Sequence, residues 1–260
     1  MMPLQTKSRW VYAISIAAPS SIFRSIRTHA VIRSILALPG ILLLIDPSWF
    51  ISPLLLDPFI YFGYYQNLPT FIRAFPSDYY GTRLPVLLPG WLAHQALPPL
   101  VANAVLRLGL YYTCIFGLYG TLVQSHGRRA AFIAAVLLGT SPFFLGAVGW
   151  DYADGFGLAY AFTAHWLLAR SRDSFATRYR LAAGFALACL VFANLFYVVF
   201  AFFVVAEFLL ATPSRGNEKW RALATISIGV LAATLMMMSI SRALGGRFLF
   251  FMGSLGAGQK

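Results

Sequence analysis

The chain has 260 residues, of which 59% are hydrophobic and 11% are charged, whereas soluble domains carry roughly 25% charged residues. Together with a mean hydropathy of +0.72, this excludes an ordinary water-soluble domain. The formal charge of +12 would suggest nucleic acid in a soluble protein. Here the basic residues separate apolar runs, so we expect a membrane protein with no nucleic-acid partner. Cys114 and Cys189 both lie inside apolar runs, and we predict neither a disulfide nor a thiolate metal site.

The predicted fold is an all-α, polytopic bundle of about six to seven membrane helices, because each span needs about 20 apolar residues. Residues 1–30 are predicted to form a cytoplasmic or interfacial lead-in, and residues 31–244 the membrane core. Single spans are expected at about 31–50, 100–123, 130–149, 155–169 and 222–244. The apolar run 181–212 is too long for one crossing. It is predicted to form a short hairpin that turns near Asn194.

Charge predicts the topology, because cytoplasmic loops collect Lys and Arg. Arginines precede the first expected span, separate the second from the third, and follow the fourth. Five of the eight acidic residues fall in the opposite segments: Asp46, Asp57, Asp78, Asp151 and Asp154. The N-terminus is therefore predicted to be cytoplasmic, and residues 245–260 an extracytoplasmic tail.

Residues 57–99 form the first predicted extracytoplasmic loop, which is rich in aromatic residues and proline. We interpret it as short helices in the membrane plane, with amphipathic rings at the level of the lipid head groups. The rings are Tyr61, Tyr64, Tyr65, Tyr79, Tyr80 and Trp91, and the interrupting prolines are Pro69, Pro76, Pro85 and Pro89.

Three carboxylates are candidates for chemistry. Asp57 opens the loop among apolar neighbours, where it could remove a proton from an acceptor hydroxyl or hold a divalent cation; the alternative is an Asp-Pro pair that ends a helix. Asp151 and Asp154 are three residues apart and would share one face of a helical turn. The fifteen residues expected for the following span cover only about 22 Å, which would draw this turn below the outer surface. An N-cap aspartate is the alternative.

Four arginines fall in the predicted outer half and could bind phosphate: Arg83, Arg107, Arg242 and Arg247. Arg107 is several residues inside an apolar run, which is costly unless the side chain snorkels to the head groups or faces an anion. The histidines show no ligand spacing. A divalent metal held by Asp57 and Asp154 is the one candidate cofactor.

Three segments resemble the GT-C membrane glycosyltransferases, in particular family 39, which contains the protein O-mannosyltransferases and the aminoarabinose transferase of lipid A. They are residues 57–61 (Asp-Pro-Phe-Ile-Tyr), 79–83 (Tyr-Tyr-Gly-Thr-Arg) and 149–155 (Gly-Trp-Asp-Tyr-Ala-Asp-Gly). The predicted hairpin also resembles the fifth and sixth helices of that family.

The resemblance implies a protein of the bacterial cytoplasmic membrane that transfers a sugar from a polyprenyl-phosphate donor to a lipid, glycan or protein acceptor, with inversion. Asp57 would be the base, Asp151 or Asp154 would position the acceptor or a cation, and an arginine would neutralise the leaving phosphate. Tyr61, Tyr79 and Tyr80 would belong to the substrate loop. Family members are longer, so a truncated product, a fragment or a core that needs a partner is expected. A transporter or flippase-like protein and an inactive assembly subunit are the alternatives.

Overall fold

The computed structural model describes residues 21–46, 56–76, 78–149, 153–174, 177–212 and 217–253. Within these ranges every regular element is helical, which confirms the all-α prediction. The α-helices are α1 (Ser21–Ile45), α2 (Leu56–Ala74), α3 (Leu84–Ala96), α4 (Pro99–Ser125), α5 (Gly127–Gly139), α6 (Pro142–Gly149), α7 (Ala153–Ser174), α8 (Thr177–Ala193), α9 (Val198–Ala211) and α10 (Asn217–Ala243). Two short 3₁₀ turns, η2 (Tyr80–Thr82) and η3 (Leu195–Tyr197), precede α3 and α9.

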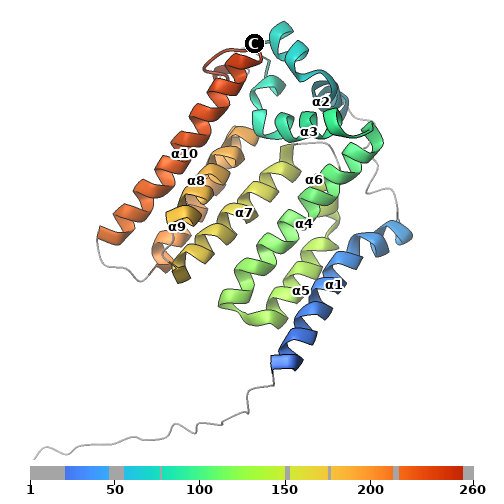
Figure 1. Cartoon of the computed structure of the whole chain (residues 1–260), viewed down its shortest axis with the longest axis vertical. Helices are drawn as coiled ribbons and strands as arrows, with labels where there is room; N and C mark the ends of the chain where they lie inside the picture. Colours follow the sequence, from blue (N-terminus) through green and yellow to red (C-terminus); the bar gives the residue numbers. More distant parts are fainter. Residues whose placement is uncertain are drawn as a thin grey trace, which may run out of the picture.

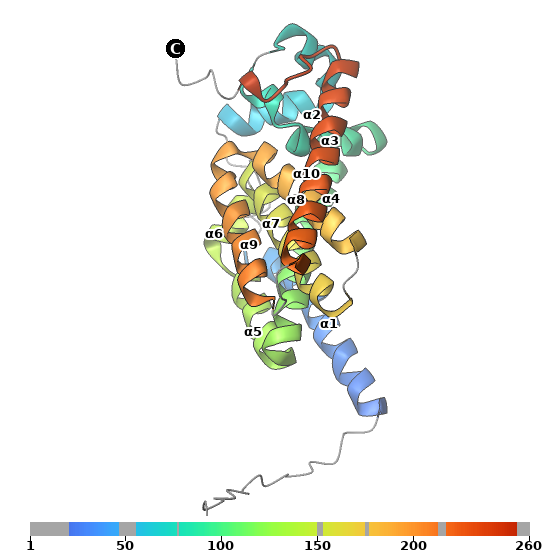
Figure 2. The same cartoon turned by 90° about the vertical axis from the view of Figure 1, so that its left-hand side faces the viewer.

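The long helices lie side by side, and α2 and α3 cover one end of them (Figure 1). α7 packs against both α4 and α8, and α8 in turn packs against α10. α1 and α5 lie on the far side of α4. Figure 2 shows α2 and α3 again at the same end, with α9 running alongside the bundle. α7 is therefore the central helix, and its first turn lies at the end that α3 covers.

Two described helices, α4 and α10, are long and apolar enough to cross a membrane, and the pair α5 and α6 would make a third span if it acts as one. This pair corresponds to the expected span 130–149, but it is bent by 61°. The break lies before Pro142, whose ring cannot continue the preceding helix but suits the first position of the next one. The structure therefore supports a membrane protein with two to three candidate spans.

Two helices extend beyond the predicted segments. α1 begins at Ser21, inside the predicted lead-in. α7 has 22 residues, which corresponds to about 33 Å of helix, because it continues past Arg170 to Ser174. The added residues include Arg170 and Arg172, so the apolar part of α7 remains short, and the depth of its first turn stays a prediction.

The predicted hairpin is confirmed as two helices, α8 and α9. Asn194 between them is extended (φ −158°, ψ 124°), and its side chain accepts a hydrogen bond from the Phe196 amide at 3.2 Å. This local bond competes with continuation of the helix, as Asn side chains commonly do in turns. The chain therefore stops at the end of α8 and restarts through η3.

α8 and α10 cross at backbone contact, through Gly184 and Gly229. A Cβ added to Gly184 would lie 3.0 Å from the Gly229 Cα and would overlap the Ile226 carbonyl oxygen. A Cβ added to Gly229 would overlap the Leu181 carbonyl oxygen. Small residues allow such close approach between membrane helices, so this crossing depends on glycine on both sides.

The head-group interpretation of the loop is wrong for three tyrosines. Tyr61, Tyr64 and Tyr65 are each 0–1% exposed and lie in an apolar core with residues of α3. The ring of Tyr65 occupies the space that a side chain at Gly90 of α3 would need. These rings are covered by protein because α2 folds back on α3, a tertiary contact that composition does not reveal.

The prolines of this loop have different roles. α2 is kinked at Asn67 (φ −136°, ψ 42°), two residues before Pro69. Pro85 lies in the first turn of α3, and Pro89 lies inside that helix. Pro69 and Pro76 thus accompany interruptions, since Pro76 follows the end of α2 at Ala74, whereas Pro85 and Pro89 do not interrupt α3.

Candidate functional site

Asp57 lies in the first turn of α2 and is half-buried. The Tyr80 hydroxyl donates to Asp57 Oδ1 at 2.6 Å. In the described part of the chain, Asp57 Oδ2 has no hydrogen-bond partner. Asp57 and Pro58 begin a helix here, so the helix-ending alternative is wrong. A carboxylate is favoured at this position by the helix dipole.

Arg83 is 2% exposed and lies at the entry to α3. Its guanidinium donates to the hydroxyls of Tyr61 and Tyr79 and stacks over the Tyr79 ring, 4.2 Å from the centroid. A buried charge is tolerated when it is hydrogen-bonded in this way. In this structure Arg83 therefore organises the tyrosines that were predicted for the substrate loop, and its phosphate-binding role stays a prediction.

Asp78 is a second carboxylate of this cluster that sequence reasoning did not select for chemistry. It accepts a hydrogen bond from the Tyr64 hydroxyl at 2.9 Å and from the Tyr80 amide at 3.2 Å. Burial, together with the bond to Asp78, raises the pKa of Tyr64, which stays a neutral donor. Asp78 thus fixes the backbone of Tyr80, whose hydroxyl reaches Asp57. The spacing Asp-x-Tyr, typical of an Asx turn, is the sequence signal.

We name these residues the α2–α3 cluster: Asp57, Tyr61, Tyr64, Asp78, Tyr79, Tyr80 and Arg83. The rings of Tyr61 and Tyr80 make an edge contact with centroids 5.5 Å apart. This contact joins the half that holds Arg83 to the half that holds Asp57. The cluster is therefore one continuous polar and aromatic unit at the end of the bundle.

Asp154 lies in the first turn of α7, half-buried, and accepts a hydrogen bond from the Tyr197 hydroxyl of η3. Asp151 lies outside the described residues. No hydrogen bond or ion pair joins Asp154 to Asp57 within the described ranges. Among those same residues, no group of three or more His, Cys, Asp or Glu side chains could hold a metal ion. A shared pocket of carboxylates, and a metal between Asp57 and Asp154, stay predictions.

The four predicted phosphate-binding arginines do not share one environment. Arg107 is 5% exposed in α4, so the snorkelling interpretation is wrong for it: the side chain is enclosed by protein. Arg242 lies in the last turn of α10 and Arg247 follows that helix, and both are exposed. Arg83 and Arg107 are thus interior groups, whereas Arg242 and Arg247 lie on the surface.

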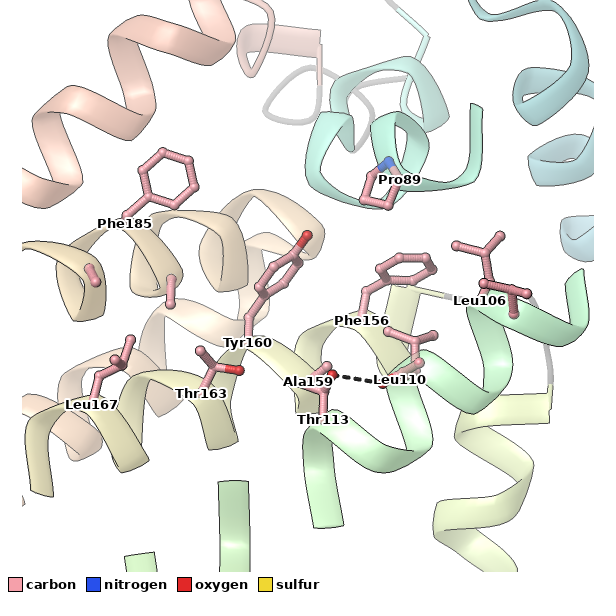
Figure 3. Close-up of a pocket in the computed structure, with 14 residues that line it drawn as sticks. Pro89, Leu106, Leu110, Thr113, Phe156, Ala159, Tyr160, Thr163, Leu167 and Phe185 are labelled. Atoms are coloured by element: carbon pink, nitrogen blue, oxygen red, sulfur yellow. Dashed lines mark hydrogen bonds between the residues drawn. The ribbon is translucent and has the colours of Figure 1, made fainter. Parts of the chain in front are cut away.

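An apolar groove with a volume of about 500 Å³ lies along α7, between α4 and α8 and below α3. Figure 3 shows the side chains of Phe156, Tyr160, Thr163 and Leu167 following one another along α7 and pointing into it. The remaining lining residues are Pro89, Val105, Leu106, Gly109, Leu110, Thr113, Ala159, Ala182, Phe185 and Ala186. Four of them are glycine or alanine, which leaves the space open. The lining suits a hydrocarbon chain.

The groove and the α2–α3 cluster are linked by packed side chains. The Tyr160 hydroxyl donates to the Pro85 carbonyl at 2.7 Å, and Pro85 is two residues from Arg83. Phe156, which lines the groove, belongs to the same buried apolar core as Tyr61. Leu106, another lining residue, packs against that core. One end of the groove therefore lies beside the polar cluster.

A comparison of the chain with protein-family models, curated proteins and solved structures finds no match. Function is therefore inferred from the groove and the α2–α3 cluster.

Proposed function

We propose that the chain is a membrane glycosyltransferase of the GT-C type, which transfers a sugar from a polyprenyl-phosphate donor to an acceptor at the extracytoplasmic face. The observation that carries the proposal is an apolar groove that adjoins, through packed side chains, a polar cluster containing a carboxylate. The proposal includes a polytopic bundle of six to seven membrane helices, a cytoplasmic N-terminus and a bacterial cytoplasmic membrane.

Asp57 supplies the base in this proposal. Its carboxylate takes the proton of the acceptor hydroxyl while the acceptor oxygen bonds to the anomeric carbon of the sugar. The bond from that carbon to the phosphate oxygen breaks, and the polyprenyl phosphate leaves with the electron pair. Attack opposite the leaving group inverts the anomeric centre. Tyr80 orients Asp57 through the bond to Oδ1, which is consistent with a base that must be held in place.

The groove holds the hydrocarbon tail of the donor. Its aromatic and aliphatic lining offers no charged group, and a tail placed there brings the phosphate to the end that adjoins the α2–α3 cluster. Arg83 is a cationic group of the α2–α3 cluster, and Arg107 follows the groove residue Leu106 in α4. We propose that they offset the charge of the departing phosphate, as cationic groups do at such centres.

The proposal is tested in membranes that contain the full chain. A panel of polyprenyl-phosphate hexoses and pentoses, radiolabelled in the sugar, is incubated with these membranes and a cellular lipid and glycan extract. We expect one donor to lose its label to an acceptor at a rate absent from control membranes. Saturable binding of a donor without turnover would favour the transporter or flippase-like alternative instead.

Gly109→Leu should weaken use of the lipid-linked donor without harming the fold. A Cβ added at Gly109 meets no atom within 4 Å, and the position lines the groove, so leucine would fill part of the space proposed for the tail. We expect the KM for the donor to rise about tenfold, which corresponds to about 1.4 kcal/mol of lost binding. The measurement is the donor dependence of transfer.

Gly40→Leu is the matched control, because Gly40 in α1 is also an exposed glycine with no atom within 4 Å of an added Cβ. Its donor dependence should equal that of the unmodified chain. Equal KM values for Gly109→Leu and Gly40→Leu would remove the groove from donor binding.

A further inference from the structure

We propose that Tyr197, at the tip of the α8–α9 hairpin, is a positioning residue that holds the Asp154 carboxylate in its working orientation. The inference deepens the proposed function and rests on it. It gives the hairpin a part in the site, whereas the sequence assigned the hairpin only a topological role.

Tyr197 packs closely against α7 beside Asp154. Tyr197 donates its hydroxyl proton to Asp154 Oδ1. The ring of Tyr197 fills the space beside Gly157, where an added Cβ would overlap the ring and lie 3.0 Å from Cζ. Asp154 and Gly157 are three residues apart and share one face of α7. The carboxylate thus takes the hydroxyl while the glycine leaves room for the ring.

The tip that carries Tyr197 is itself fixed. The Tyr197 amide donates to the Asn194 carbonyl at 2.9 Å, and the Asn194 side chain caps η3. The ring of Tyr197 also makes an edge contact with Phe200 of α9, with centroids 5.9 Å apart. A hydrogen-bond donor mounted on such a turn has little freedom to follow a carboxylate that moves, so it determines where the carboxylate lies.

The opposite end of α9 is tied to α7 as well. Glu207, the charged residue within α9, accepts a hydrogen bond from Arg172 at 3.1 Å and contacts His165, both on α7. Phe208 beside it is 1% exposed. α9 is therefore held along the central helix at both ends, which keeps Tyr197 in register with Asp154.

The first turns of α7 carry residues of both sites. Asp154 and Gly157 contact Tyr197 of η3, whereas Phe156 and Tyr160 line the groove. In the proposed reaction Tyr197 therefore acts on acceptor positioning through Asp154, next to the helix turns that hold the donor tail.

The first test is a double-mutant cycle on sugar transfer with Tyr197→Phe and Asp154→Asn. We expect Tyr197→Phe to lower kcat/KM about tenfold, since a hydrogen bond to a charged group is lost. In the Asp154→Asn background the same change should have little further effect, because residues that act as a unit are not additive. Tyr112→Phe is the control, since it removes a hydroxyl bonded to the Leu36 carbonyl of α1 at 2.8 Å, away from the site.

The second test needs no turnover. The carboxyls of the purified chain are labelled with a water-soluble carbodiimide and glycine ethyl ester, and the label at Asp154 is quantified by mass spectrometry. We expect Tyr197→Phe to increase labelling at Asp154 severalfold, whereas Tyr112→Phe should leave it unchanged.

The outcomes separate the two proposals. Unchanged labelling at Asp154, or additive effects in the cycle, would overturn the positioning role of Tyr197. Increased labelling in a chain that transfers no sugar from any donor of the panel would reject the proposed function, and the positioning role with it, while the contact itself stands. Increased labelling together with a non-additive cycle would support both.

Discussion

Asp57→Asn should lower sugar transfer by about a thousandfold, within the range lost when a positioned general base is removed. Asparagine has the same shape and can still accept the Tyr80 hydroxyl at its oxygen, so the geometry of the α2–α3 cluster should survive. What it cannot do is take a proton from the acceptor. Losing a charge in the first turn of α2 should cost only about 0.3–1 kcal/mol of stability.

Two further variants show whether the loss comes from the base. Tyr80→Phe keeps the carboxylate and removes its hydrogen bond, so we expect an intermediate loss of about tenfold. Glu218→Gln removes a carboxylate from the first turn of α10, far from the cluster in sequence, and should transfer sugar at the unmodified rate. If Asp57→Asn retained more than about a tenth of the activity, a base contribution of the usual size would be excluded.

Gly229→Leu should destabilise the chain by about 3 kcal/mol or more, at the upper end of the cost of overpacking. The added side chain would meet the Leu181 carbonyl and the Gly184 Cα. These are backbone atoms of α8, which cannot rotate away as a side chain can, so the helices must separate. Since total stability is about 5–15 kcal/mol in proteins generally, much of the margin would be lost.

The measurement for this prediction is thermal unfolding in detergent, followed by circular dichroism. Gly184→Leu should give a loss of similar size, because Gly184 faces the same crossing from α8. Gly109→Leu, with open space around its added Cβ, should unfold near the temperature of the unmodified chain. An unchanged unfolding temperature for Gly229→Leu would show that α8 and α10 do not touch as described.

The sequence predicted those parts of the fold that depend on local chemistry. Asn194 breaks the long apolar run because its side chain offers the backbone an alternative hydrogen-bond partner. This single polar residue is the signal that the sequence shows. The composition predicted helices throughout. α7 extends beyond the expected span 155–169 because its polar last turns lie beyond the apolar run, and hydropathy alone does not follow a helix into polar residues.

The candidate site was harder to predict from the sequence, because its contacts join residues from different helices. Asp57, Arg83 and Tyr80 were selected, yet nothing local indicated that Arg83 would bond to tyrosines or that Asp78 would hold Tyr80. The groove exists because α4 and α8 both pack on α7, which is a property of the bundle. Tyr197 was missed because its partner Asp154 is 43 residues away.

Val105 and Phe185, on the two walls of the groove, are 50% and 37% exposed, so the groove is open along its side. If this flank faces the acyl chains, a long isoprenoid can slide in from the bilayer and slide out again without its tail ever meeting water. Substrate supply then becomes a two-dimensional diffusion problem. Turnover should accordingly follow the mole fraction of donor in the membrane rather than its bulk concentration.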